Sequence, residues 1–205
     1  MPEIIRGIEQ NTPEWEALRI ASVGSTAIND IAPKGTGYKN ALYKFVGEMV
    51  SGVKAESYKF KHADRGHEFE PAAREMYELV NGVEVEQICM IKGDKPHTHT
   101  STDGLIREDG IFEAKVRIPS EFIKLAEGKA PPIGDLRQCY WDLYVSEKKW
   151  VDTVNYCPEI ANAKRGGYIE KRIHRDTCEP LIKELADIAD EFIKEMLGKA
   201  KQRNF

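Results

Sequence analysis

The chain has 205 residues, of which 41% are hydrophobic and 31% charged, which is enough for one globular core. Its net charge of -4 excludes a protein that coats nucleic acid by bulk positive charge, although a local basic groove is compatible with it. No apolar run reaches the roughly 20 residues of a transmembrane helix. Four separated cysteines without a C-x-x-C pair, and no secretory leader, predict a soluble cytoplasmic protein with free thiols and a single domain over residues 1–205.

The first part of the chain predicts three helices. Thr12 as N-cap and Pro13 at the first helical position predict a short helix that places Trp15 and Arg19 one turn apart. Apolar residues at helical spacing predict a second helix within 38–52 and a third within 65–82. In the third, Pro71 either lies in the first turn or kinks the helix and turns Glu70 toward a cleft.

The middle and the end of the chain predict strands mixed with helices. Alternating side chains predict strands at 84–92, 100–106, 111–117, 149–156 and 166–174. A helix capped by Ser120, a second helix over 135–147 and a long amphipathic helix over 177–197 complete the pattern. This order predicts an α/β fold with a central mixed sheet flanked by helices.

Three charged residues of the hairpin at 101–117 suggest chemistry. Glu113 and Lys115 are two apart on one strand and therefore leave from the same face. If the numbers of paired residues sum to 216, Asp103 lies opposite Glu113, residues 107–109 form the loop and Gly110 takes the left-handed conformation.

Two carboxylates paired in this way repel each other unless a cation lies between them. Carboxylate oxygens suit Mg²⁺ or Mn²⁺, and such an ion supports phosphodiester hydrolysis by activating water and stabilising the leaving oxygen. Lys115 would hold the attacking water or neutralise developing negative charge. The hairpin therefore predicts a metal-dependent phosphodiesterase site.

His97 and His99 form a second candidate metal pair. Alternation along a strand would put both imidazoles on one face, as in a zinc site, but no third ligand is evident. Polar histidines at a strand edge are the alternative interpretation.

These residues also carry a family resemblance. Asp103-Gly104 followed by Glu113-Ala114-Lys115 on the next strand resembles the D-x(n)-E-x-K signature of the PD-(D/E)XK nucleases. The segment RGHEFEPAARE resembles the helix that presents an extra acid in the lambda exonuclease and YqaJ group, with Glu70 at the matching place. WEALRIASVGSTAI resembles the N-terminal segment of that group, and DLRQCYWDLYV resembles its glutamine-bearing helix. Over residues 12–157, the chain is similar to lambda-type alkaline exonucleases of phage recombination systems.

The resemblance implies a restriction-endonuclease-like core and a Mg²⁺-dependent exonuclease, in which Mn²⁺ can substitute. Such an enzyme degrades one strand of linear double-stranded DNA from 5′ to 3′. It further implies a phage or prophage origin, a ring-shaped homotrimer and a single-strand annealing protein as partner. The alternatives are a restriction-type endonuclease with the same metal site and a non-catalytic protein that binds DNA ends.

The resemblance also implies residue roles. Asp103, Glu113 and the backbone carbonyl of Ala114 would bind the metal, Lys115 would serve the attacking water, and Gln138 would orient Lys115 or the water. Glu70 would be an additional metal or water ligand, or would instead pair with Arg74 one turn along its helix.

A 5′-terminal phosphate would be held by Arg19, with Ser25 or Thr26 completing the pocket. Trp15 either stacks there or packs in the core.

Overall fold

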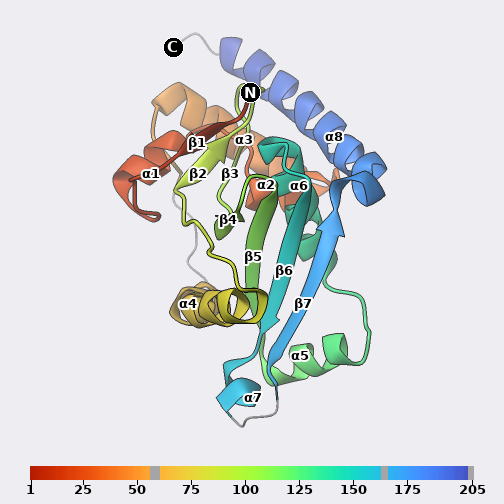
Figure 1. Ribbon diagram of the computed structural model, residues 1–205. Helices are drawn as coiled ribbons and strands as arrows, with labels where there is room; N and C mark the ends of the chain where they lie inside the picture. Colours follow the sequence, from red (N-terminus) through yellow and green to blue (C-terminus); the bar gives the residue numbers. More distant parts are fainter. Residues whose placement is uncertain (56–60, 163–165, 203–205) are drawn as a thin grey trace.

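The computed structural model describes residues 1–55, 61–162 and 166–202 (Figure 1). The helices are α1 (Pro13–Leu18), α2 (Ser25–Ile31), α3 (Thr36–Ser51), α4 (Lys61–Asn81), α5 (Pro119–Ala126), α6 (Ile133–Ser146), α7 (Pro158–Asn162) and α8 (Arg175–Lys201). The strands are β1 (Glu3–Ile5), β2 (Met90–Lys92), β3 (His99–Thr100), β4 (Gly104–Ile106), β5 (Gly110–Val116), β6 (Trp150–Tyr156) and β7 (Tyr168–His174).

A four-stranded sheet in the order β4-β5-β6-β7 forms the centre of the fold. Strands β5 and β6 are parallel, because α5 and α6 form the crossover between them, and the other two pairings are antiparallel. The sheet is therefore mixed, as the sequence predicts. A smaller antiparallel sheet holds β1, β2 and β3 in that order.

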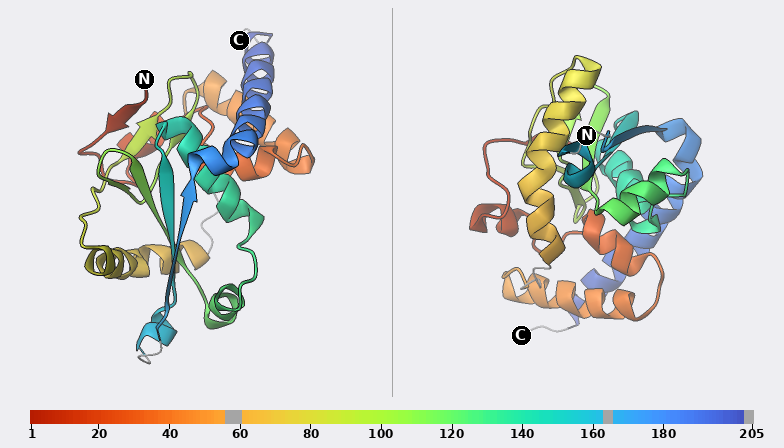
Figure 2. Two further views of the ribbon diagram at one scale, coloured as in Figure 1. Left: turned by 45° about the vertical axis from the view of Figure 1, so that its right-hand side comes forward. Right: turned by 90° about the horizontal axis from the view of Figure 1, so that it is seen from below.

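Side chains alternate across β5 and separate the two faces of the central sheet. Phe112 points toward α4, where its ring lies 5.1 Å from that of Tyr77. Glu113 and Lys115 point the other way, toward Gln138 of α6. Helix α8 packs against α3 and α6 and, with α2, closes the larger core (Figure 2). Phe112 thus joins a core cluster on one face of the sheet, and Glu113 and Lys115 form a charged group on the other.

The predicted hairpin register is confirmed. Gly104 pairs with Phe112 and Ile106 with Gly110, so Asp103 precedes β4 beside Glu113. The left-handed residue is Arg107 (φ 52°) and not Gly110, which corrects the expected turn. Gly110 is needed for a different reason, since a Cβ there would lie 2.1 Å from the ring of Trp150.

The predicted strands at 84–92 and 100–106 are shorter than expected. Only Met90–Lys92 forms a strand in the first segment, where Glu86 makes an isolated bridge to Leu105. The second segment divides into β3 and β4, which belong to different sheets. Asp103 lies where the chain crosses from one sheet to the other.

Two helix starts also differ from the prediction. Helix α4 continues through Pro71, so this proline lies inside the helix rather than in its first turn. Helix α5 has Ile118 as N-cap and Pro119 at its first position, which places Ser120 inside the helix.

In the described part of the chain, no helix combines the length and the apolar character needed to cross a membrane. The four cysteines are free and buried.

Candidate active site

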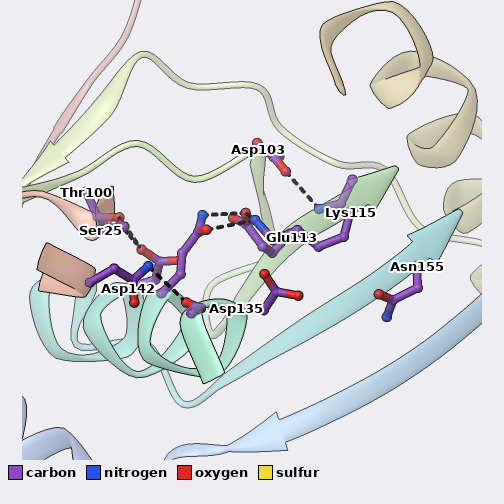
Figure 3. Close-up of polar contacts among 12 residues, drawn as sticks. Ser25, Thr100, Asp103, Glu113, Lys115, Asp135, Asp142 and Asn155 are labelled. Atoms are coloured by element: carbon purple, nitrogen blue, oxygen red, sulfur yellow. Dashed lines mark hydrogen bonds and ion pairs between the residues drawn. The ribbon is translucent and has the colours of Figure 1, made fainter. Parts of the chain in front are cut away.

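Three of the predicted site residues, Glu113, Lys115 and Gln138, are joined by side-chain hydrogen bonds, and Asp103 lies beside them, bonded to the backbone of β5 (Figure 3). Lys115 Nζ lies 2.7 Å from Glu113 Oε1 and donates to Gln138 Oε1 at 2.7 Å. Gln138 Nε2 in turn donates to Glu113 Oε1. Asp103 Oδ2 accepts from the backbone N–H of Ala114 at 2.8 Å, which fixes this carboxylate beside β5.

The charges of this cluster are not balanced by the protein alone. Burial raises the pKa of Glu113 to about 8 and that of Asp103 to about 7, and neighbouring carboxylates add to both effects. Burial lowers the pKa of Lys115, but Glu113 and Asp103 outweigh this effect and raise it above its usual value. The lysine thus stays charged and neutralises one carboxylate, whereas the second carboxylate lacks a cation.

The residues present fit a divalent cation. Glu113 is 1% exposed, and its Oε2 is buried without a hydrogen-bond partner. Within the described residues, no three His, Cys, Asp or Glu side chains form a closed metal cluster. Mg²⁺ commonly uses one or two carboxylates and completes its shell with water and substrate phosphate, so an open pair of acids matches its chemistry.

Glu70 reaches the same region from α4. Burial raises its pKa, while the charges of Arg74 and Lys115 oppose this effect. Its carboxylate also contributes to the raised pKa of Asp103. Arg74 Nη1 is 4.0 Å from Glu70 Oε1, a loose i,i+4 ion pair that leaves Glu70 able to act at the cluster.

Arg19 lies in a separate, partly buried group. Its guanidinium carbon is 3.8 Å from the ring centre of Trp15, and its Nε donates to His99 Nε2 at 3.1 Å. Trp15 is 8% exposed, so it packs in the core and also supports Arg19 through a cation–π contact. Burial and the charge of Arg19 lower the pKa of His99 to about 3, so this imidazole is a neutral acceptor for Arg19.

The histidine pair is not a zinc site. His97 has a left-handed backbone (φ 63°), and its Nδ1 contacts the carbonyl oxygen of Ala21. His99 is buried between Arg19 and Ser22, whose Oγ lies 2.8 Å from His99 Nδ1. The zinc hypothesis is wrong because the chain turns at His97 and the two imidazoles have different partners.

Of the two hydroxyls considered for the phosphate pocket, Ser25 is tied to a buried acid. Ser25 Oγ donates to Asp142 Oδ1 at 2.6 Å, and Thr100 Oγ1 donates to the same oxygen. Thr26 is exposed one residue further along α2. A third hydroxyl, that of Ser101, is buried without a partner two residues before Asp103.

Sequence reasoning missed Ser101 and Asp142, and it considered His99 only as a metal ligand or a strand-edge histidine and not as a partner of Arg19. Asp142 follows Gln138 by four residues, so both leave the same side of α6, and this spacing was the available signal. The contact of His99 with Arg19 joins distant parts of the chain and gave no signal in the sequence, and the burial of the Ser101 hydroxyl gave none either.

Comparisons with known proteins agree with this geometry. The profile of the YqaJ-like viral recombinase domain matches residues 14–149. An alkaline exonuclease from Laribacter hongkongensis superposes with a TM-score of 0.82 at 24% identity, covering 93% of this chain and 95% of that one. Its complex with dAMP gives a TM-score of 0.80 at 24% identity, with the same coverage of both chains.

A phage-related exonuclease from Haemophilus somnus gives a TM-score of 0.62 at 14% identity over 90% of this chain and 98% of that one. These structural matches confirm the predicted central mixed sheet. Among curated proteins, no sequence matches significantly.

Proposed function

Because the chain belongs to the YqaJ-like viral recombinase family, we propose that it is a Mg²⁺-dependent exonuclease acting on linear double-stranded DNA. In this proposal it degrades one strand from 5′ to 3′ and leaves 3′ single-stranded overhangs. The observation that carries the proposal is the partly buried cluster of Asp103, Glu113 and Lys115, in which one buried oxygen of Glu113 has no partner. The structural relatives are named as exonucleases, which supports the same activity.

Four groups would hold the cation. Asp103 and Glu113 are the carboxylate ligands, the backbone carbonyl of Ala114 is a third ligand, and Glu70 binds the ion or its water. Mn²⁺ can substitute, since it takes the same oxygen ligands. Such an ion supplies Lewis-acid stabilisation of charge that develops on the phosphate oxygens.

Lys115 and Gln138 orient the reacting groups. The Lys115 ammonium carries three N–H bonds, of which two point to Glu113 and Gln138, so the third can hold the attacking water or a phosphate oxygen. Gln138 contacts both Lys115 and Glu113, so it fixes their relative position.

Arg19 gives the proposed direction of digestion. A guanidinium held flat by Trp15 and bonded to His99 presents its remaining N–H groups to a 5′-terminal phosphate. The hydroxyls of Ser25, Thr26 and Ser101 are the candidates that complete this pocket. Binding the 5′ end beside the cluster would set cleavage to proceed from that end.

The partners in this proposal are linear DNA, two further copies of the chain in a ring-shaped homotrimer, and a single-strand annealing protein. Family membership fits an origin in a phage or prophage. Sedimentation analysis tests the trimer, because three copies of a 23.2 kDa chain have a distinct mass.

A digestion assay tests the activity. With Mg²⁺, the purified protein should release mononucleotides from linear duplexes with 5′-phosphates and spare closed circles, and a chelator should stop it. Glu113→Ala and Lys115→Ala should abolish digestion. Glu184→Ala and Lys183→Ala, which change exposed residues of α8, are the matched controls and should digest normally.

Other outcomes identify the alternatives. Discrete fragments from closed circles would indicate a restriction-type endonuclease. Binding of DNA ends without cleavage, with or without Mg²⁺, would indicate a non-catalytic end-binding protein.

A further inference from the structure

Two cavities share a wall with the Asp103–Glu113–Lys115 cluster, and their charges differ. The first has a volume of about 390 Å³, and its charged walls are Glu9, Glu70 and Asp103 with one cation, Arg74. The second has a volume of about 220 Å³ and lies between α5, α6 and the strands β5 to β7. It is lined by four cationic side chains with one carboxylate, and we call it the lysine cavity: Lys115, Arg117, Lys129, Lys171 and Asp135.

Two of these cations already have partners. Lys115 is bonded to Glu113 and Gln138, and the guanidinium of Arg117 is paired with Asp135 and with Asn155. These groups are held in place by the protein, so they form the fixed inner wall of the lysine cavity.

The other two cations are free to bind an anion. Lys129 follows α5 and Lys171 lies on β7, and both are exposed. Among the residues that the structure describes, neither ammonium makes a hydrogen bond or an ion pair. Two uncompensated positive charges at the rim of a cavity favour a ligand that carries phosphate.

The remaining walls are largely apolar. Leu125, Leu136, Ile169 and Ile173 line the cavity, with Thr153 as a polar neighbour. A volume of about 220 Å³ is below the roughly 300–1,000 Å³ of pockets for drug-sized ligands, so the space suits one nucleobase and not a stacked pair. Apolar walls contact the faces of a base and make no hydrogen bonds to its edges, so they do not distinguish one base from another.

We propose that the lysine cavity binds one nucleotide of the DNA strand, next to the scissile phosphate. The base lies against the apolar walls. The phosphate on one side of it is the scissile phosphate at the cluster, and the phosphate on its other side contacts Lys129 and Lys171. This inference rests on the proposed function, because it takes the cluster at Lys115 as the place of cleavage. Neighbouring nucleotides are joined by one phosphodiester, so the next nucleotide must occupy a space that adjoins the cluster. The other adjoining cavity contains Asp103 and Glu70, which the proposed function assigns to the cation and the scissile phosphate, so the lysine cavity is the space left for the neighbouring nucleotide.

The test measures binding of a linear duplex with a single-stranded end, in a chelator to prevent cleavage, over a series of salt concentrations. Lys129→Ala combined with Lys171→Ala should weaken binding and reduce the slope of log Kd against log salt by about 0.7, since one contacted phosphate of a single strand contributes about 0.7. Lys183→Ala combined with Lys194→Ala removes two exposed lysines from α8 and is the matched control.

A third variant tests the apolar part of the lysine cavity. Leu125→Trp fills the space and leaves both lysines, so it should raise Kd with an unchanged salt slope. Thermal unfolding of each variant shows whether the fold is retained.

Each outcome decides the question. An affinity and slope equal to those of the control would overturn the inference while the wild type still digests DNA. A wild type that binds DNA but does not digest it overturns the proposed function and the placement next to a scissile phosphate, whereas a reduced salt slope in the double variant still assigns the lysine cavity to the DNA strand. A free mononucleotide that competes with DNA for the wild type but not for the double variant would assign the cavity to the released product and overturn its assignment to the strand.

Discussion

Replacing Asp142 by Asn should raise the stability of the protein relative to the wild type as pH increases. Asp142 is fully buried on α6, where Oδ1 accepts from Ser25 and Thr100 and Oδ2 has no partner. Burial, with the nearby charge of Glu113, raises its pKa from 3.8 to about 7. At about 1.36 kcal/mol per pH unit, this shift means that the folded state destabilises the ionised form of Asp142, relative to the protonated form, by about 4 kcal/mol.

The sign follows from proton binding. The folded pKa lies above the unfolded value, so protonated Asp142 stabilises the fold at low pH, and this contribution is lost as pH rises from about 4 to about 7. The Asp142→Asn variant cannot ionise there and keeps an oxygen that accepts from Ser25 and Thr100. Its free energy of unfolding, compared with wild type, should therefore rise by about 3 kcal/mol between about pH 5 and about pH 8.5.

Urea unfolding at both pH values, in a chelator, measures this difference. Any constant effect of the new amide group cancels, because only the change with pH is compared. Asp187→Asn, which changes an exposed carboxyl on α8, is the matched control. If the difference between Asp142→Asn and wild type were the same at both pH values, the reasoning from burial would be wrong.

Three further substitutions test the site and the sheet. Arg19→Lys keeps the positive charge but loses the planar guanidinium that can make two parallel hydrogen bonds to a phosphate, so the preference for 5′-phosphate over 5′-hydroxyl ends, measured as a ratio of initial digestion rates, should fall roughly 10-fold. An unchanged preference would show that Arg19 does not bind the 5′-phosphate. Gln138→Ala removes the hydrogen bonds that join Gln138 to Lys115 and to Glu113, so it should lower kcat about 10- to 100-fold with little change in KM. A rise in KM alone would indicate instead that Gln138 acts in substrate binding. Gly110→Ala pushes a methyl group into the Trp150 ring and should lower the free energy of unfolding by about 1–3 kcal/mol, measured by urea titration; a neutral effect would show that the ring moves freely.

The sequence predicts the geometry of the hairpin at 101–117 well because its information is local. Strand alternation places Glu113 and Lys115 on one face, and turn length sets the register that brings Asp103 beside them. Both features depend on residues within a span of 17 positions, 101–117, which a pattern can describe. The family motif adds the positions of Glu70 and Gln138.

The support of the site could not be predicted in the same way. Asp142 contacts Ser25 across 117 positions of the chain, and His99 contacts Arg19 across 80. A single acid in an amphipathic helix or a single histidine in a strand has no periodicity of its own, so only the folded structure shows that it is buried. The division of the segment 100–106 between two sheets escaped prediction for the same reason, since alternation does not reveal which strand is the neighbour.

Helix α6 contributes both to the candidate site and to the core, and this combination affects how the protein loses activity on heating. It presents Gln138 to the cluster, and it also packs against α2 and α8 at the centre of the larger core. The backbone amides of α6 should therefore exchange with solvent deuterium only through global opening, in the slowest class of the chain. Heat should then inactivate the protein at the temperature at which it unfolds, with no earlier local melting of the site.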